Sequence, residues 1–102
     1  MEIDRIGEGL RSIEQIFSDS FPITSFQKCK ILNLHCNCLS SLKMLPTLHL
    51  LTELNLSSNL FTSCDDMQEL AMCSSLTSLD LSANKLVYCI VLYYSIVLYS
   101  IV

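Results

Sequence analysis

The sequence predicts an α/β solenoid in which short repeats stack into a parallel sheet on one concave face, with a helical cap at the N-terminus. A register of leucines and one asparagine occurs three times within the 102 residues, and self-similarity at a near-constant period is the signature of stacked-repeat folds. In each copy two leucines lie two positions apart, which is the spacing of side chains on one face of a strand. The copies begin at Cys29, Leu51 and Leu76.

The repeats define the predicted domain organisation. They occupy residues 29–50, 51–75 and, in part, 76–86. The second repeat has extra positions, and the stretch Ser63 to Asp66 within it has the spacing of a capping box. Acidic residues at a helix start are favoured by the helix dipole, so we expect a short helix over residues 65–73.

Leucine and asparagine have separate roles in this pattern. The leucine pair of each strand should point into the core, because no single repeat buries its apolar face alone. An asparagine side chain both donates and accepts hydrogen bonds, so stacked copies should satisfy the backbone of adjacent turns. The leucine pairs are Leu32/Leu34, Leu54/Leu56 and Leu79/Leu81, and the asparagines are Asn37, Asn59 and Asn84.

Residues 1–28 precede the first full repeat and are predicted to cap its open edge. Apolar residues at helical spacing favour an amphipathic helix, although Gly7 and Gly9 weaken its middle. The stretch 9–13 also reads as the second half of a degenerate repeat, and both forms stay open. The apolar stripe consists of Ile3, Ile6, Leu10, Ile13 and Phe17.

The tail, residues 87–102, departs from the pattern. It carries no charge and repeats one unit, Tyr-x-Ile-Val-Leu-Tyr. A membrane span needs about 20 apolar residues, so the tail is too short for one and no membrane partner is expected. Our leading interpretation is simple-repeat, intron-like sequence after Leu86, which makes the chain a truncated form of a longer protein. A short tail anchor and an ordinary C-terminal cap are the alternatives.

The shared register, L-x-x-L-x-L-x-x-N-x-L, resembles that of the leucine-rich repeat family over residues 29–86. The first repeat has 22 residues and is similar to the class found in nuclear phosphatase regulators, dynein light chain and many ciliary or centrosomal proteins. Residues 9–13 and 32–37 together resemble the start of a centrosomal protein with leucine-rich repeats and a coiled coil. These resemblances imply a cytoplasmic scaffold associated with the cytoskeleton or the centrosome.

Charge and composition exclude several classes of function. The formal charge is −4 and the six Lys and Arg residues are scattered, so no nucleic-acid partner is expected. The acidic start lacks the apolar stretch of a signal peptide. The six cysteines are therefore predicted to be reduced thiols.

No catalytic, cofactor or metal site is predicted. The stretch from His35 to Cys38 is the one that suggests a metal site. Zinc needs four converging ligands, however, and the Cys-x-Cys spacing is tighter than the usual paired-cysteine spacing of zinc sites. The stretch also lacks a third group to orient a nucleophile, and the pair Asp65-Asp66 is better explained as a helix start. We therefore predict a binding protein, without a cofactor, rather than an enzyme.

The candidate binding surface is the outward side of the strands. The third, fifth and seventh positions of each repeat should line up across the sheet as a polar, slightly acidic patch. This patch could accept hydrogen bonds and a basic group, and a merely solvent-exposed role is the alternative. Three strands span only about 10 Å, which is small beside a standard interface of about 800 Å² per partner. The candidate residues are Ile31, Asn33, His35, Glu53, Asn55, Ser57, Ser78, Asp80 and Ser82.

The predicted function is that of a scaffold or adaptor that binds a protein partner through this face. The alternative, implied by the repeat class, is a regulatory subunit of an enzyme such as a protein phosphatase. A fragment without function is the third interpretation, because a solenoid needs capped ends and only the N-terminal end has a candidate cap.

Overall fold

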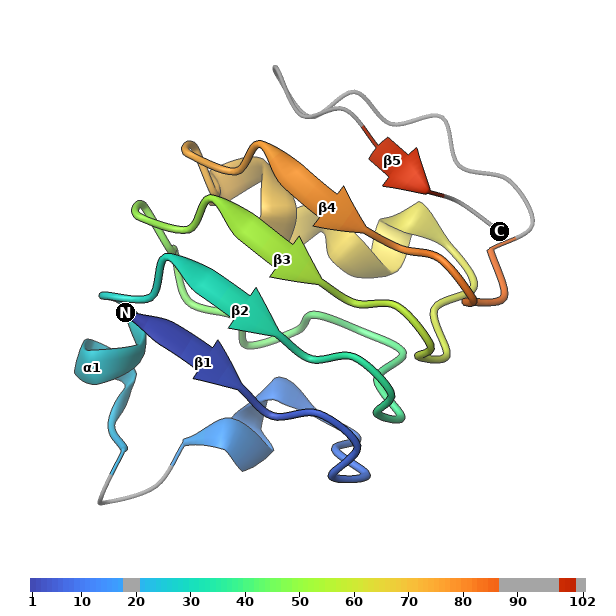
Figure 1. The fold of residues 1–102 in the computed structure, drawn as a ribbon, viewed down its shortest axis with the longest axis horizontal. Coiled ribbons are helices and arrows are strands. Elements are labelled where there is room, and N and C mark those ends of the chain that lie inside the picture. Colours follow the sequence, from blue (N-terminus) through green and yellow to red (C-terminus); the bar gives the residue numbers. More distant parts are fainter. Residues whose placement is uncertain (18–20, 87–97, 101–102) are drawn as a thin grey trace.

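The computed structural model describes residues 1–17, 21–86 and 98–100. Five short strands form one sheet in which every neighbouring pair is parallel. Their order in the sheet is their order along the chain, and the returning segments run behind the sheet (Figure 1). The strands are β1 (Glu2–Asp4), β2 (Ile31–Asn33), β3 (Glu53–Asn55), β4 (Ser78–Asp80) and β5 (Leu98–Ser100).

The register of the strands stacks one apolar side chain from each repeat. Ile3, Leu32, Leu54 and Leu79 are partners across β1 to β4, and each is buried. Because side chains alternate along a strand, their neighbours in sequence lie on the opposite face. The predicted burial of all six strand leucines is confirmed: Leu32, Leu34, Leu54, Leu56, Leu79 and Leu81 are at most 2% exposed.

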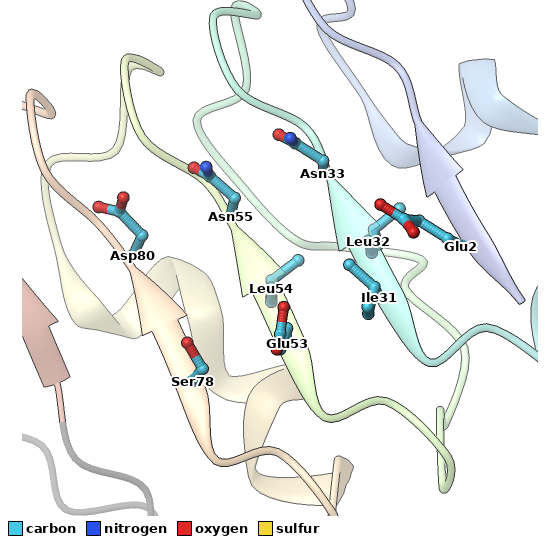
Figure 2. A pocket seen from close by; sticks show the side chains of 9 residues that line it. All are labelled: Glu2, Ile31, Leu32, Asn33, Glu53, Leu54, Asn55, Ser78 and Asp80. Atoms are coloured by element: carbon cyan, nitrogen blue, oxygen red, sulfur yellow. The ribbon is translucent and has the colours of Figure 1, made fainter.

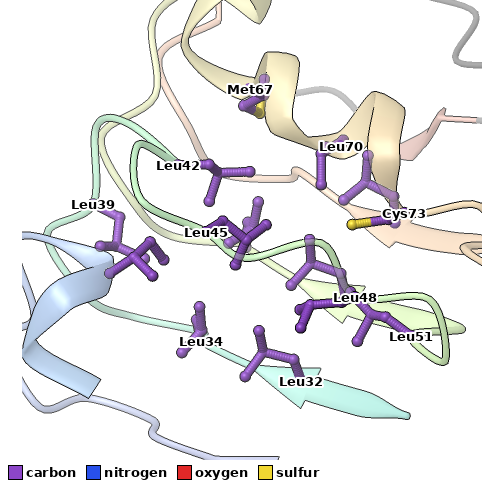
Figure 3. Packing of buried hydrophobic residues seen from close by; sticks show 14 of the residues in the cluster. Leu32, Leu34, Leu39, Leu42, Leu45, Leu48, Leu51, Met67, Leu70 and Cys73 are labelled. Atoms are coloured by element: carbon purple, nitrogen blue, oxygen red, sulfur yellow. The ribbon is translucent and has the colours of Figure 1, made fainter. Parts of the chain in front are cut away.

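The core lies between the sheet and the returning segments. Leu42, Leu45 and Leu48, which the sequence spaces three residues apart, come from the segment that follows β2. Figure 3 shows these side chains packed with the strand leucines and with residues of the next returning segment. That segment contributes Met67 and Leu70, each 1% exposed.

The returning segments contain little regular helix. The first holds the 3₁₀ helix η1 (Ile13–Ile16) and the single α-helical turn α1 (Ile23–Phe26). Phe26 is fully buried there, and the rings of Phe17 and Phe21 meet it edge-on at centroid distances of 5.2 and 6.1 Å.

The helix expected over residues 65–73 is present, but as a 3₁₀ helix, η2 (Cys64–Met72), with a kink at Met67. The Ser63 side chain accepts a hydrogen bond from the Asp65 backbone N–H at 3.1 Å, which is the capping role that its position predicts. The tighter 3₁₀ winding is common in short connecting helices.

A ladder of three asparagines joins the turns that follow the strands. Asn59 accepts a hydrogen bond from the Leu39 N–H at 3.0 Å and donates to the carbonyls of Leu34 and Leu56, both at 3.0 Å. Asn84 repeats this pattern one turn later, bonding to the Phe61 N–H and the Leu56 carbonyl at 3.1 and 2.9 Å. Asn37 makes the equivalent bonds to the segment after β1. The predicted backbone-satisfying role of these side chains is confirmed.

The expected amphipathic helix over the stripe from Ile3 to Phe17 is wrong. Its first residues form β1 instead, and the backbone turns away at Gly7 and Gly9, whose φ values are +65° and +67°. Left-handed backbone of this kind interrupts a right-handed helix. The cap predicted over residues 1–28 is therefore a strand, a turn and two helical pieces, and the degenerate-repeat form is the one that fits.

Charged residues replace the repeat pattern at the β1 edge. The Arg5 N–H bonds to the Asn33 carbonyl at 2.9 Å, as the Leu34 N–H bonds to the Asn55 carbonyl, so Arg5 takes a leucine position. Glu8 takes the asparagine position by the same alignment, and its carboxylate pairs with Arg5 at 2.8 Å. Both residues follow β1 at the edge of the sheet, where charge opposes pairing with further strands.

Each predicted repeat contributes one of the strands β2, β3 and β4, while assignment to a leucine-rich repeat solenoid stays a prediction. The interpretations of the tail concern residues 87–102, which lie outside the described residues except for β5. Within the described part of the chain, no helix is long and apolar enough to span a bilayer.

Candidate functional site

One face of the sheet is not covered by the returning segments, and we call it the open sheet face. A hollow of about 310 Å³ lies on it (Figure 2). Four strands contribute to the hollow, so it exists only because the repeats stack. Its lining residues are Glu2, Ile31, Leu32, Asn33, Glu53, Leu54, Asn55, Ser78 and Asp80.

The first row of the open sheet face runs across the first residue of each of the strands β1 to β4. Glu2 pairs with Ile31, Ile31 with Glu53, and Glu53 with Ser78. The two glutamates and Ser78 are exposed, whereas Ile31 is half-buried between the glutamates. An apolar side chain is thus flanked on both sides by carboxylates.

The second row lies where the strands end. It consists of Asp4, Asn33, Asn55 and Asp80, which are partners in the sheet register. In three of them a side-chain oxygen accepts a hydrogen bond from the backbone N–H two residues later, at 2.9 to 3.1 Å. These Asx turns hold the side chains in fixed orientations on the face.

The third predicted row, His35, Ser57 and Ser82, is engaged in internal hydrogen bonds. The Ser57 hydroxyl donates to Asn55 Oδ1 at 2.5 Å and lies 2.6 Å from His35 Nδ1. Because its one proton goes to Asn55, the hydroxyl must accept from His35, which places a proton on Nδ1. The Ser82 hydroxyl likewise donates to Asp80 Oδ1 at 2.6 Å.

These bonds change the role of the third row. Ser57 is only 5% exposed, so it supports Asn55 and His35 and offers little surface to a partner. Among the nine predicted residues it is the one that the structure buries, and it contacts both Asn55 and His35. The other eight are half-buried or exposed.

The charge of the open sheet face is negative. Glu2, Glu53 and Asp80 line the hollow and no lysine or arginine does. Asp4 extends the second row beside Asn33 and is also exposed. A face with this charge is complementary to a cationic partner.

Glu2 and Asp4 were missed as residues of the open sheet face because the apolar stripe suggested a helix rather than a strand. A signal for them exists in the sequence. In the first two repeats a buried apolar residue lies seven positions after the buried strand residue, as in the pairs Leu32 and Leu39, and Leu54 and Phe61. Ile3 and Leu10 have the same separation and both are buried, which marks Glu2 and Asp4 as the outward flanks of a strand.

The cysteines divide by burial. Burial raises the pKa of the Cys29 and Cys73 thiols above their ordinary value of 9.0, while Cys36 and Cys38 are free and exposed. Cys64 is disulfide-bonded, which corrects the expectation of a reduced thiol for that residue.

Selective alkylation should follow this division. At pH 8 we expect iodoacetamide to modify Cys36 and Cys38 first, whereas Cys29 and Cys73 react only as the chain opens, because they are buried and hold their protons more tightly. Mass spectrometry of peptides over a time course would measure this. Equal rates at all four thiols would contradict the packing.

The same pKa shifts set a direction for stability against pH. A thiol pKa raised in the folded state means that the folded chain binds the proton more tightly than the unfolded chain. The contribution of Cys29 and Cys73 is therefore complete below pH 9.0 and is lost as the pH rises through their folded pKa values. Urea unfolding at pH 8 and pH 10 should show lower stability at pH 10, by less in a Cys29→Ala variant.

No alternative chemistry is assembled elsewhere in the described residues. They contain no group of three or more His, Cys, Asp or Glu side chains placed to hold a metal ion. A second hollow of about 400 Å³, lined by His49, Ala71, Met72 and Ser74, is mainly apolar and brings no acid beside the histidine. Comparison of the chain with protein-family models, with curated proteins and with solved structures finds no match.

Proposed function

We propose that this chain is a protein-binding module of the leucine-rich repeat type, a scaffold or adaptor whose partner docks on the open sheet face. The observation that carries the proposal is the hollow lined by side chains from β1, β2, β3 and β4. Stacked repeats use such extended surfaces for binding. The resemblance of the repeats to those of cytoplasmic scaffolds supports the same assignment.

Rigidity of the face supports a binding role. Asn33, Asn55 and Asp80 are each held by a hydrogen bond to the backbone two residues later. A partner that docks on them therefore does not have to freeze mobile side chains, and this lowers the entropic cost of association.

Site-specific photocrosslinking tests the proposal. p-Benzoylphenylalanine at position 53 or 78 places the reactive group on the open sheet face, whereas the same group at Lys43 places it on an exposed returning segment. In extracts of the source cells we expect one shared partner to crosslink from positions 53 and 78, and not from position 43.

Two outcomes would overturn the proposal. One is a partner that crosslinks from position 43 and from neither of the other two positions, which would put the binding surface on the returning segments. The other is the absence of any shared crosslink from positions 53 and 78 while the variants remain folded by circular dichroism.

A further inference from the structure

The first row of the open sheet face has the composition of a site for a long cationic side chain. Ile31 is half-buried, with Glu2 as its partner on β1 and Glu53 as its partner on β3. Adjacent strands are about 4.8 Å apart, so the two glutamate backbones stand about 10 Å from each other with the isoleucine between them. Figure 2 shows both carboxylates beside Ile31.

Lysine and arginine match this arrangement because each joins an apolar stem to a charged head. The stem would lie on Ile31 and the head would reach a carboxylate on either side. Neither glutamate has an internal cation to neutralise it, since the ion pair found in the described part of the chain is Arg5 with Glu8.

The second row adds hydrogen-bond donors beside this site. The Oδ1 atoms of Asn33 and Asn55 are engaged by the backbone N–H groups of His35 and Ser57. This fixes which side-chain atom is oxygen and leaves each Nδ2 amide group as the donor of a residue that lines the hollow. Two amide donors on neighbouring strands need acceptors, and the carbonyl groups of a peptide backbone supply them.

We propose that the open sheet face binds a linear peptide segment through one lysine or arginine side chain, held over Ile31 between Glu2 and Glu53. Asn33 and Asn55 donate to the backbone carbonyls of the same segment. The inference rests on the proposed function and names its partner chemistry: a basic, extended stretch of another protein. A free polyamine supplies the cation without the carbonyl groups, so it satisfies only the first row.

Nuclear magnetic resonance titration tests the proposal at the weak affinity that a small face provides. The probes are acetyl-Ala-Gly-Lys-Gly-Ala-amide, the same peptide with arginine or glutamine in place of lysine, and spermidine. We expect the lysine and arginine peptides to shift the Ile31 methyl signals and the side-chain amide signals of Asn33 and Asn55. The glutamine peptide should bind about tenfold more weakly, since it loses two exposed ion pairs.

Matched variants separate a specific site from general attraction to an acidic protein. The double variant Glu2→Gln/Glu53→Gln should weaken binding of the lysine peptide by about tenfold. The control Glu14→Gln/Glu69→Gln removes the same charge from two residues outside the hollow and should leave affinity unchanged within about twofold. Ile31→Ser, which keeps both carboxylates, should also weaken binding, because the apolar contact for the stem is lost.

Equal weakening by the two double variants would overturn the proposal, as would spermidine shifting the Asn33 and Asn55 amides as strongly as the peptide does. Absence of binding by the lysine and arginine peptides would overturn it as well. Crosslinking of one partner from positions 53 and 78 would then show that the face still binds a protein of different chemistry.

Discussion

Asn59→Ala should lower the free energy of unfolding by about 2 kcal/mol, since a buried polar group left unpaired costs about 1–3 kcal/mol. Asn59 is 3% exposed and its side chain satisfies the Leu39 N–H and the carbonyls of Leu34 and Leu56. Asn37 and Asn84 also donate to the carbonyls of Leu34 and Leu56, at 3.0 and 2.9 Å, so the Leu39 N–H is the group that loses its partner. Domains of this size are stable by about 5–15 kcal/mol, so the variant should stay folded at 25 °C and unfold at a lower urea concentration than the parent chain.

Urea unfolding followed by circular dichroism would measure the loss, and Asn33→Ala is the matched control. Asn33 is half-buried and its side chain accepts one hydrogen bond, from the His35 N–H at 3.1 Å. Its removal should cost about 1 kcal/mol. Equal losses in the two variants would mean that the asparagine ladder has no special part in stability.

Leu56→Ala should cost about 3 kcal/mol, because truncation of a fully buried leucine removes its packing and leaves a cavity. Leu56 has no exposed surface and directly follows β3. The same substitution at Leu60, which is 42% exposed, should cost less than about 1 kcal/mol. Thermal or urea unfolding of the pair would check this, and similar values for both would contradict the described core.

The sequence predicted those parts of the fold that its period encodes. Leu32, Leu54 and Leu79 recur at fixed positions, and their burial and register follow from the repeat alone. The asparagine bonds were predictable for the same reason. The burial of the leucines and the hydrogen bonds of the asparagines both follow from residue types at constant positions in the repeat. Neither requires knowledge of how distant segments pack.

The N-terminal strand was missed because it departs from the period. Arg5 stands where the other repeats have a leucine and Glu8 where they have an asparagine, so the register gives no match. Ile3 precedes its partner Leu32 by 29 positions, whereas Leu32 precedes Leu54 by 22. Apolar residues in this longer segment happen to fall at helical spacing, and pairing with β2 outweighs that local preference.

The candidate surface was predictable in outline but not in detail. Alternation along the strands placed Glu53 and Asn55 on the outward face. Whether an outward residue is accessible depends on its neighbours across strands, and the burial of Ser57 arises from His35 on the preceding turn. Such contacts have no signal in a single sequence.

The asparagine ladder also has a direction. Asn59 bonds to the turn of the repeat before its own, through Leu34 and Leu39, and Asn84 does the same for Leu56 and Phe61. Each turn is therefore held by hydrogen bonds from the repeat that follows it. Loss of one repeat removes these hydrogen bonds from the repeat before it and not from the repeat after it. We expect the described repeats to unfold from the C-terminal side towards β1, so that the turn from Arg5 to Leu10, which Asn37 secures, keeps its hydrogen-exchange protection longest.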